Sequence, residues 1–101
     1  LPTPHSVFKR YTVLMHIVYL LQHDETHEKY IGCTDNLERR LHEHNTGQQT
    51  ATRRKTGVWK VIYAEIFRAK GDAVMRERKL KNNARGRQEL YKRISASELE
   101  N

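Results

Sequence analysis

The chain has 101 residues, of which 31% are charged and 37% are hydrophobic, and this size predicts a single compact domain. No apolar run approaches the roughly 20 residues that a membrane-spanning helix needs, so we expect no membrane partner. The net charge of +7 favours a polyanionic partner. The single cysteine, Cys33, excludes an intramolecular disulfide framework and fits an intracellular, cytoplasmic setting.

The N-terminal third is expected to form an irregular lead-in followed by a β-hairpin. The lead-in, residues 1–15, holds both prolines. Residues 16–23 are apolar on both alternating faces, which predicts an inner strand covered on both sides. A polar turn at residues 24–27 then leads to a returning strand at residues 28–34.

A helix is expected from Asp35 to about Asn45. Asp35 and the glutamate three residues later have the form of a capping box, and Gly47 follows as a stop signal. Residues 46–57 lack apolar periodicity and include three consecutive basic residues, so we expect a mobile basic loop. The β-branched and aromatic residues 58–67 predict a third strand.

The C-terminal third is expected to be helical. We predict a helix over residues 71–84 and a second helical segment over 87–94, after a break at Gly86. Residues 95–101 are polar and are expected to form a frayed tail. This order of elements predicts an α+β domain over residues 16–94, in which a three-stranded sheet is flanked by helices.

The first predicted helix places polar residues next to its apolar face. At the helical spacing of about 100° per residue, Leu37 and Leu41 define the apolar direction, and Arg40 and His44 flank it. Arg39 points to the opposite side. We interpret Arg40 and His44 as candidate functional residues. The alternative is that Arg40 extends past the core to solvent and that His44 is a hydrogen-bonded boundary residue.

The second predicted helix carries a carboxylate on its apolar stripe. Ala73, Leu80 and Ala84 form the stripe, and Glu77 falls within it. An ionised carboxylate that faces a core is costly unless it is paired or binds a cation. Glu77 is therefore either the partner of a nearby arginine or a ligand to a metal such as Mg²⁺, which accepts one carboxylate plus waters.

The hairpin strands add two tyrosines and a glycine. Tyr19 and Tyr30 lie on adjacent predicted strands, and Gly32 follows Tyr30 by two residues on the same face. A strand glycine leaves room for a close approach. Aromatic residues in strands are also common core residues, so this pattern has a purely structural alternative.

The positive charge is concentrated in the second half of the chain. Residues 52–93 hold 14 Lys/Arg against 4 Asp/Glu, a balance of +10, whereas the remainder holds 5 against 8, a balance of −3. This distribution indicates nucleic acid as the partner, with a solubilising face as the alternative. The candidate nucleic-acid contacts are Arg53, Arg54, Lys55, Arg76, Lys79 and Lys81.

Together these residues resemble the GIY-YIG nuclease family. The resemblance spans about residues 16–92 and is to the small stand-alone members, which are similar to the nuclease domain of the bacterial nucleotide-excision repair enzyme. It is carried by Ile17-Val18-Tyr19, Tyr30-Ile31-Gly32, Asn36-Leu37-Glu38-Arg39-Arg40-Leu41, His44-Asn45-x-Gly47, the Trp59-Lys60 strand and the Arg76-Glu77 helix.

The resemblance implies an antiparallel three-stranded sheet and metal-dependent hydrolysis of DNA. By position, Tyr19 and Tyr30 match the two motif tyrosines, Arg40 the catalytic arginine, His44 a position held by His or Tyr, and Glu77 the metal-binding glutamate. Two positions depart from the pattern. Ile17 replaces the first-motif glycine, and Cys33 stands where some members carry a lysine near the attacking water.

The predicted function is an endonuclease with Mg²⁺ as its cofactor, or Mn²⁺ as the alternative ion. We expect structure-selective or weakly sequence-specific cleavage of DNA, in repair or recombination, by a nucleoid-associated protein. RNA stays open as a substrate, and a protein partner or further domain is the expected source of any specificity. Two other interpretations are a nucleic-acid-binding module of the same fold and a scaffold whose basic face meets an acidic protein.

Overall fold

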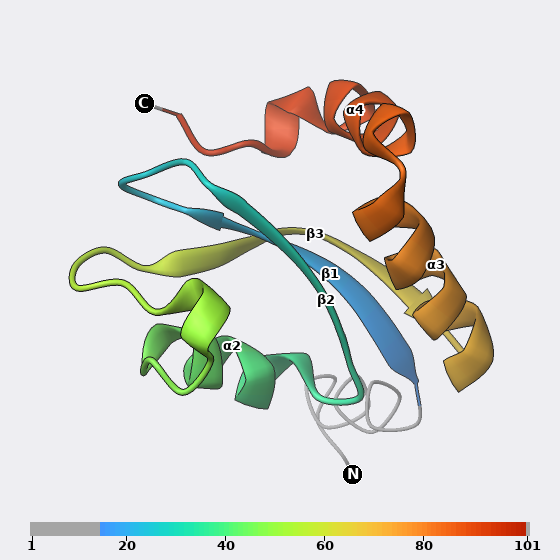
Figure 1. Ribbon diagram of the computed structural model, residues 1–101, viewed down its shortest axis with the longest axis horizontal. Coiled ribbons are helices and arrows are strands. Elements are labelled where there is room, and N and C mark those ends of the chain that lie inside the picture. The colour runs from blue at the N-terminus through green and yellow to red at the C-terminus, as the bar shows by residue number, and fades with distance from the viewer. Residues whose placement is uncertain (1–14, 101) are drawn as a thin grey trace, which may run out of the picture.

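A three-stranded antiparallel sheet forms the centre of the molecule (Figure 1). The computed structural model describes residues 15–100, so the expected lead-in lies outside the described residues except for its last one. The strands are β1 (His16–His23), β2 (Lys29–Thr34) and β3 (Trp59–Phe67). Their order is β2-β1-β3, which confirms the prediction that the apolar strand is the inner one.

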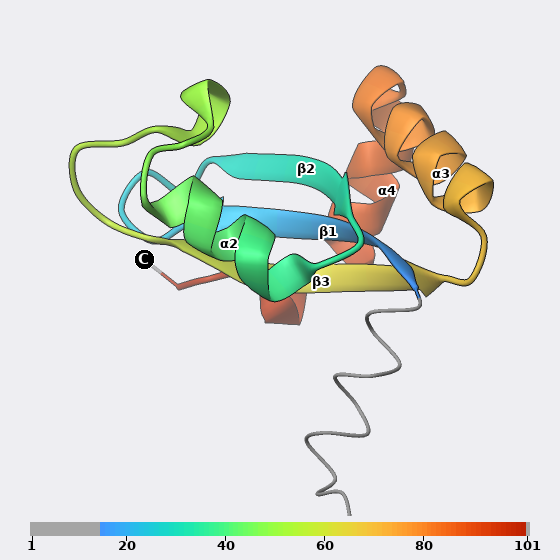
Figure 2. The ribbon, with the colours of Figure 1, turned by 90° about the horizontal axis from the view of Figure 1, so that it is seen from below.

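Within residues 15–100, three α-helices cover the sheet, which confirms the predicted α+β class. Helix α2 (Leu37–Asn45) lies on one side of the strands, and α3 (Lys70–Asn82) and α4 (Ala84–Arg93) lie on the other (Figures 1 and 2). Two 3₁₀ turns complete the described chain, η1 (Thr50–Thr52) and η2 (Ser95–Ser97).

The alternating residues of β1 build a separate core on each face of the sheet. Val18 and Leu20 pack with residues of α3 and α4. Ile17, Tyr19 and Leu21 pack toward α2 and β3. Because successive side chains of a strand point to opposite faces, a strand covered on both sides has apolar residues at consecutive positions, as Ile17 to Leu21 show.

Two helix boundaries differ from the sequence predictions, each because an asparagine caps the helix. The Asn36 side chain accepts from the backbone N–H of Arg39, 3.0 Å away, so Asn36 and not Asp35 is the N-cap. The break between the last two helices lies at Asn83, whose side chain accepts from Gly86 N at 3.0 Å. Gly86 therefore lies inside α4, and the predicted break there is wrong.

Two segments that were expected to be loose are held by specific contacts. In residues 46–57, the carbonyl of Thr52 accepts from Trp59 Nε1 at 2.7 Å. The C-terminal segment returns to the sheet, where Leu99 N donates to Gln22 Oε1 at 2.7 Å. Sequence reasoning missed both because neither contact follows from a helical or strand period, and the second joins residues 77 positions apart.

Candidate functional site

The side chain of Tyr19 lies across the neighbouring strand at the position of Gly32. The two residues are paired in register between β1 and β2. A Cβ added to Gly32 would collide with the Tyr19 ring and hydroxyl. The close approach that the glycine predicts is therefore made by a side chain of the protein itself.

A buried chain of hydrogen bonds begins at this hydroxyl. Tyr19 Oη lies 2.7 Å from Nε2 of His44, and Nδ1 of His44 lies 2.7 Å from the hydroxyl of Thr52. Thr52 in turn donates to the Gln49 carbonyl at 3.4 Å. Because the Thr52 proton is engaged there, Thr52 accepts from Nδ1–H and His44 presents the lone pair of Nε2 to the Tyr19 hydroxyl.

Burial controls the protonation of this pair. Burial raises the pKa of Tyr19, the nearby Tyr30 adds to the increase, and the guanidinium of Arg40 opposes it. Burial, and then the positive charge of Arg40, lower the pKa of His44. At neutral pH both groups are therefore neutral, as the assigned hydrogen bonds require.

Tyr30 joins the same cluster through its ring. The ring centroids of Tyr30 and His44 are 4.9 Å apart with an interplanar angle of 61°, and those of Tyr30 and Tyr19 are 6.5 Å apart. The two tyrosines and the histidine predicted from separate segments are thus adjacent in the fold. Edge-to-face packing of this kind holds the rings in defined orientations.

A cavity of about 380 Å³ brings residues of both helix layers together. Arg40 reaches it from α2 and Glu77 from α3, although the two helices cover opposite faces of the sheet. Its other lining residues are His16, Cys33, Thr34, Asp35, Arg39, Lys70 and Val74. Position 33 is a cysteine rather than a lysine, but Lys70 supplies an amine to the same cavity.

Glu77 forms an ion pair within its own helix. Its carboxylate lies 3.3 Å from the Lys81 amine, and its side chain is 23% exposed. Ala73 and Leu80 are buried beside it, as the stripe predicts. Ala84 is exposed and belongs to α4, so the prediction that the stripe extends to it is wrong. The partner of Glu77 is a lysine, not the arginine that the structural alternative anticipated.

The donor chemistry of the cavity suits a hard divalent cation. Within residues 15–100 no group of three or more His, Cys, Asp or Glu side chains could enclose a metal ion. The carboxylates on the cavity wall are those of Asp35, paired with Arg39, and Glu77. Mg²⁺ retains several waters and is bound in proteins through one or two carboxylates. Glu77 with waters therefore fits Mg²⁺, whereas a cage made wholly of protein ligands does not.

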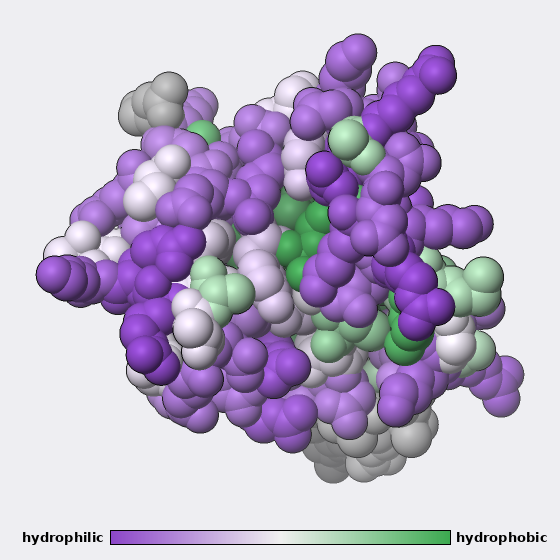
Figure 3. All heavy atoms as spheres, in the orientation of Figure 1, coloured by the Kyte–Doolittle hydropathy of each residue, from purple (hydrophilic) through white to green (hydrophobic). Residues whose placement is uncertain are grey.

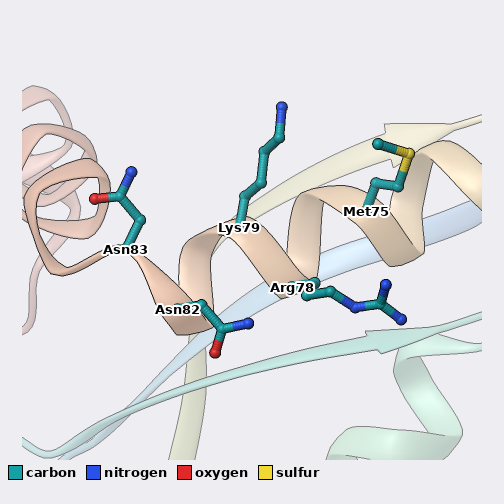
Figure 4. A pocket seen from close by; sticks show the side chains of 5 residues that line it. All are labelled: Met75, Arg78, Lys79, Asn82 and Asn83. Carbon is teal, nitrogen blue, oxygen red and sulfur yellow. The ribbon is translucent and has the colours of Figure 1, made fainter.

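The six predicted nucleic-acid contacts lie on different parts of the surface. Arg54 pairs with Glu28 at 2.7 Å, and Arg76 makes three hydrogen bonds of 2.9 to 3.1 Å with Glu65. Lys79 lines a separate pocket of about 320 Å³ on α3 (Figure 4). Arg53 donates to a backbone carbonyl, Lys55 is exposed, and Lys81 lies beside Glu77.

The structure gives roles to two polar residues to which sequence reasoning had assigned none. Thr52 is fully buried and orients His44. Asn45 bonds both backbone groups of Trp59, at 3.1 and 2.7 Å, and so fastens the end of α2 to β3. Neither residue lies on a periodic pattern that could have identified its partner.

Comparison with known proteins places the fold in a family. The model of the GIY-YIG catalytic domain matches residues 15–94. The chain belongs to the GIY-YIG family. This membership implies a nuclease-type function. Within residues 15–100, no helix is both long enough and apolar enough to cross a membrane.

Several relatives of this GIY-YIG domain are UPF0213 proteins. One from Natronomonas pharaonis is 40% identical over 76 residues, which cover 73% of this chain and 86% of the relative. One from Clostridium perfringens is 39% identical over 72 residues, which cover 70% of this chain and 75% of the relative. The solution NMR structure of a UPF0213 protein from Bacillus halodurans is 26% identical with a TM-score of 0.47, covering 75% of this chain and 80% of that one.

Proposed function

We propose that this protein is a metal-dependent endonuclease that hydrolyses DNA phosphodiester bonds, with structure-selective or weakly sequence-specific cleavage. The observation that carries the proposal is the convergence of Arg40 and Glu77, from helices on opposite faces of the sheet, on one cavity. The Tyr19–His44 pair adjoins it, because His44 lies one turn after Arg40 on α2 and Tyr19 pairs with Gly32, the residue before the cavity-lining Cys33. A cation, an anion and a proton-transfer pair in one place are what phosphodiester hydrolysis requires.

Arg40 is suited to hold the scissile phosphate. Its guanidinium donates to Glu43 at 3.1 Å and is 35% exposed, so it is positioned but still accessible. A guanidinium matches the non-bridging oxygens of a phosphate and offsets the charge that develops in the transition state. A divalent cation bound at Glu77 would stabilise the leaving 3′ oxygen.

The buried hydrogen-bond chain offers a route for the proton of the attacking water. Tyr19 stays protonated at neutral pH because its pKa is raised. It accepts the water proton on Oη as it passes its own proton to Nε2 of His44, 2.7 Å away. The products are hydroxide, which attacks phosphorus, a neutral tyrosine and an imidazolium. Tyr30, which packs on His44, is the alternative acceptor.

The basic residues supply affinity without sequence recognition. The six predicted contacts named above would meet phosphates of the DNA backbone, which carry little sequence information. A domain of this size leaves little surface for base contacts, which is why we propose structure selectivity. A place in DNA repair or recombination belongs to the same proposal.

The test is cleavage of a panel of single-stranded, duplex, nicked, flapped and branched DNA with Mg²⁺ or Mn²⁺. Glu77→Gln is compared with wild type and with Glu89→Gln, an exposed carboxylate on α4. We expect metal-dependent cleavage by wild type and Glu89→Gln, and loss of cleavage with retained binding for Glu77→Gln. Equal cleavage by Glu77→Gln and wild type would exclude Glu77 as the essential metal ligand.

A second candidate is a nucleic-acid-binding module that does not cut. The Glu77–Lys81 ion pair favours it, because the carboxylate already has a cationic partner at 3.3 Å. Salt-sensitive DNA binding by wild type, with no product under either metal ion, would support this candidate over the nuclease.

A further inference from the structure

A second pocket lies next to the candidate site, between β2 and the α3–α4 pair. Its volume is about 230 Å³, and it is lined by Lys29, Tyr30, Ile31, Lys81, Arg87 and Tyr91. Figure 3 shows hydrophobic side chains in a hollow between the sheet and these helices, with hydrophilic side chains around it. The pocket shares Tyr30 with the tyrosine–histidine cluster.

Three cationic side chains converge on this pocket. The Lys29 amine lies 4.9 Å from the ring centroid of Tyr91, and the Lys81 amine 5.6 Å from that of Tyr30. Arg87 donates to the carbonyls of Leu80 and Lys81 at 2.9 and 2.7 Å. Contacts with aromatic faces and carbonyls orient these groups without neutralising their charge.

Carboxylates balance this charge incompletely. Lys29 pairs with Glu98 at 3.4 Å, and Lys81 pairs with Glu77 at 3.3 Å. The contacts of Arg87 in the described residues are to uncharged carbonyls. Both ion pairs are partly exposed, so an incoming anion can compete for the amines.

The pocket continues the line of the candidate site along α3. Glu77 faces the larger cavity, and Lys81, one helical turn later, faces this pocket. Four helical residues rise about 6 Å, which is the scale of one nucleotide step in a nucleic-acid backbone. A strand whose scissile phosphate lies at Arg40 and Glu77 can therefore pass over β2 and place another phosphate here.

We propose that this pocket binds a backbone phosphate of the substrate strand, adjacent to the scissile phosphate, through Lys29, Lys81 and Arg87. The inference rests on the proposed function and deepens it, because it assigns a second phosphate contact and the path of the strand across β2. Occupation of Glu77 by a cation would release Lys81 to this phosphate, so metal and substrate binding would favour each other.

The first experiment measures binding of a labelled oligonucleotide without divalent metal at several salt concentrations. Lys29→Gln should lower the slope of log affinity against log salt by about 0.7 to 0.9, the loss of one phosphate contact. Lys60→Gln, which removes an exposed lysine from β3, should leave the slope unchanged. Glu98→Gln should tighten binding more than Glu89→Gln, which removes the same charge from an exposed site on α4, because only Glu98 pairs with Lys29; equal gains would show a general charge effect.

The second experiment locates the phosphate with oligonucleotides that carry one neutral methylphosphonate at successive positions. Wild type should lose affinity at a position next to the cut site, and Lys29→Gln should lose that sensitivity. Equal sensitivity of the two proteins at every position, with an unchanged salt slope, would overturn the proposal. Binding is measured without metal and is therefore independent of cleavage. If wild type fails to cleave, the nuclease function is refuted, but a phosphate site detected by these binding measurements stands.

Discussion

The hydroxyl of Tyr19 and Nε2 of His44 lie 2.7 Å apart in the protein interior, and this hydrogen bond joins the central strand to α2. Both residues are 2% exposed. A buried bond between two neutral groups depends on distance and angle, because water cannot replace a lost partner. Arg40 lies one turn before His44 on the same helix, so its placement depends on the position of the Tyr19 side chain.

Substitution of Gly32 by alanine should displace the side chain of Tyr19. The new Cβ would collide with the tyrosine ring, so we expect the free energy of unfolding to fall by about 1–3 kcal/mol and cleavage to be lost. Gly71→Ala is the matched control, since a Cβ there meets nothing within 4 Å and its position is helical. Denaturant unfolding and DNA cleavage of both variants test this, and a Gly32→Ala protein as stable and active as wild type would refute it.

The stability of the protein should fall in mild acid, in part because of His44. Burial lowers the pKa of His44. Below a pH of about 6.5, His44 is therefore protonated in the unfolded chain but stays neutral in the folded protein. The stabilisation is fully present above that pH and is lost as the pH falls toward the lowered folded-state pKa. Unfolding measured between about pH 5 and 7 should show a smaller loss for His44→Gln. Identical pH dependence of the two proteins would contradict this assignment.

Arg40 and Arg39 should differ sharply in their effect on cleavage, although they are neighbours. Removal of a group that stabilises transition-state charge costs about 10²- to 10³-fold in rate, and we expect Arg40→Ala to show a loss of that size. Arg39 also lines the cavity, but it is 59% exposed and its guanidinium is already paired with Asp35, so Arg39→Ala should retain the rate within a few-fold. Single-turnover cleavage is the measurement, and similar losses for both variants would indicate a general charge effect.

Asn45 should be important for stability rather than for chemistry. It supplies partners to both the N–H and the carbonyl of Trp59, and removal of partners from such backbone groups costs about 1–3 kcal/mol. Asn45→Ala should therefore unfold at lower urea concentration, whereas Asn82→Ala, at the exposed end of α3, should not. An unchanged midpoint for Asn45→Ala would show that water replaces these bonds.

Local patterns in the sequence determined the elements and the direction of several side chains. Residues 16–23, which are apolar on both alternating faces, predicted a central strand, and the sheet order confirmed it. Helical spacing predicted Arg40 to be less exposed than Arg39, as its 35% against 59% shows, although both line the cavity; it also placed Glu77 beside Ala73 and Leu80. These predictions succeed because the periods of helix and strand dictate which side chains share a face.

Only the tertiary structure decided which faces meet and which groups become partners. The bonds of His44 to Tyr19 and to Thr52 join residues 25 and 8 positions apart, and Lys29 meets Tyr91 only because α4 folds back beside β2. Hydrogen-bond partners depend on the distance and angle between elements, and no repeating period in the chain encodes these quantities.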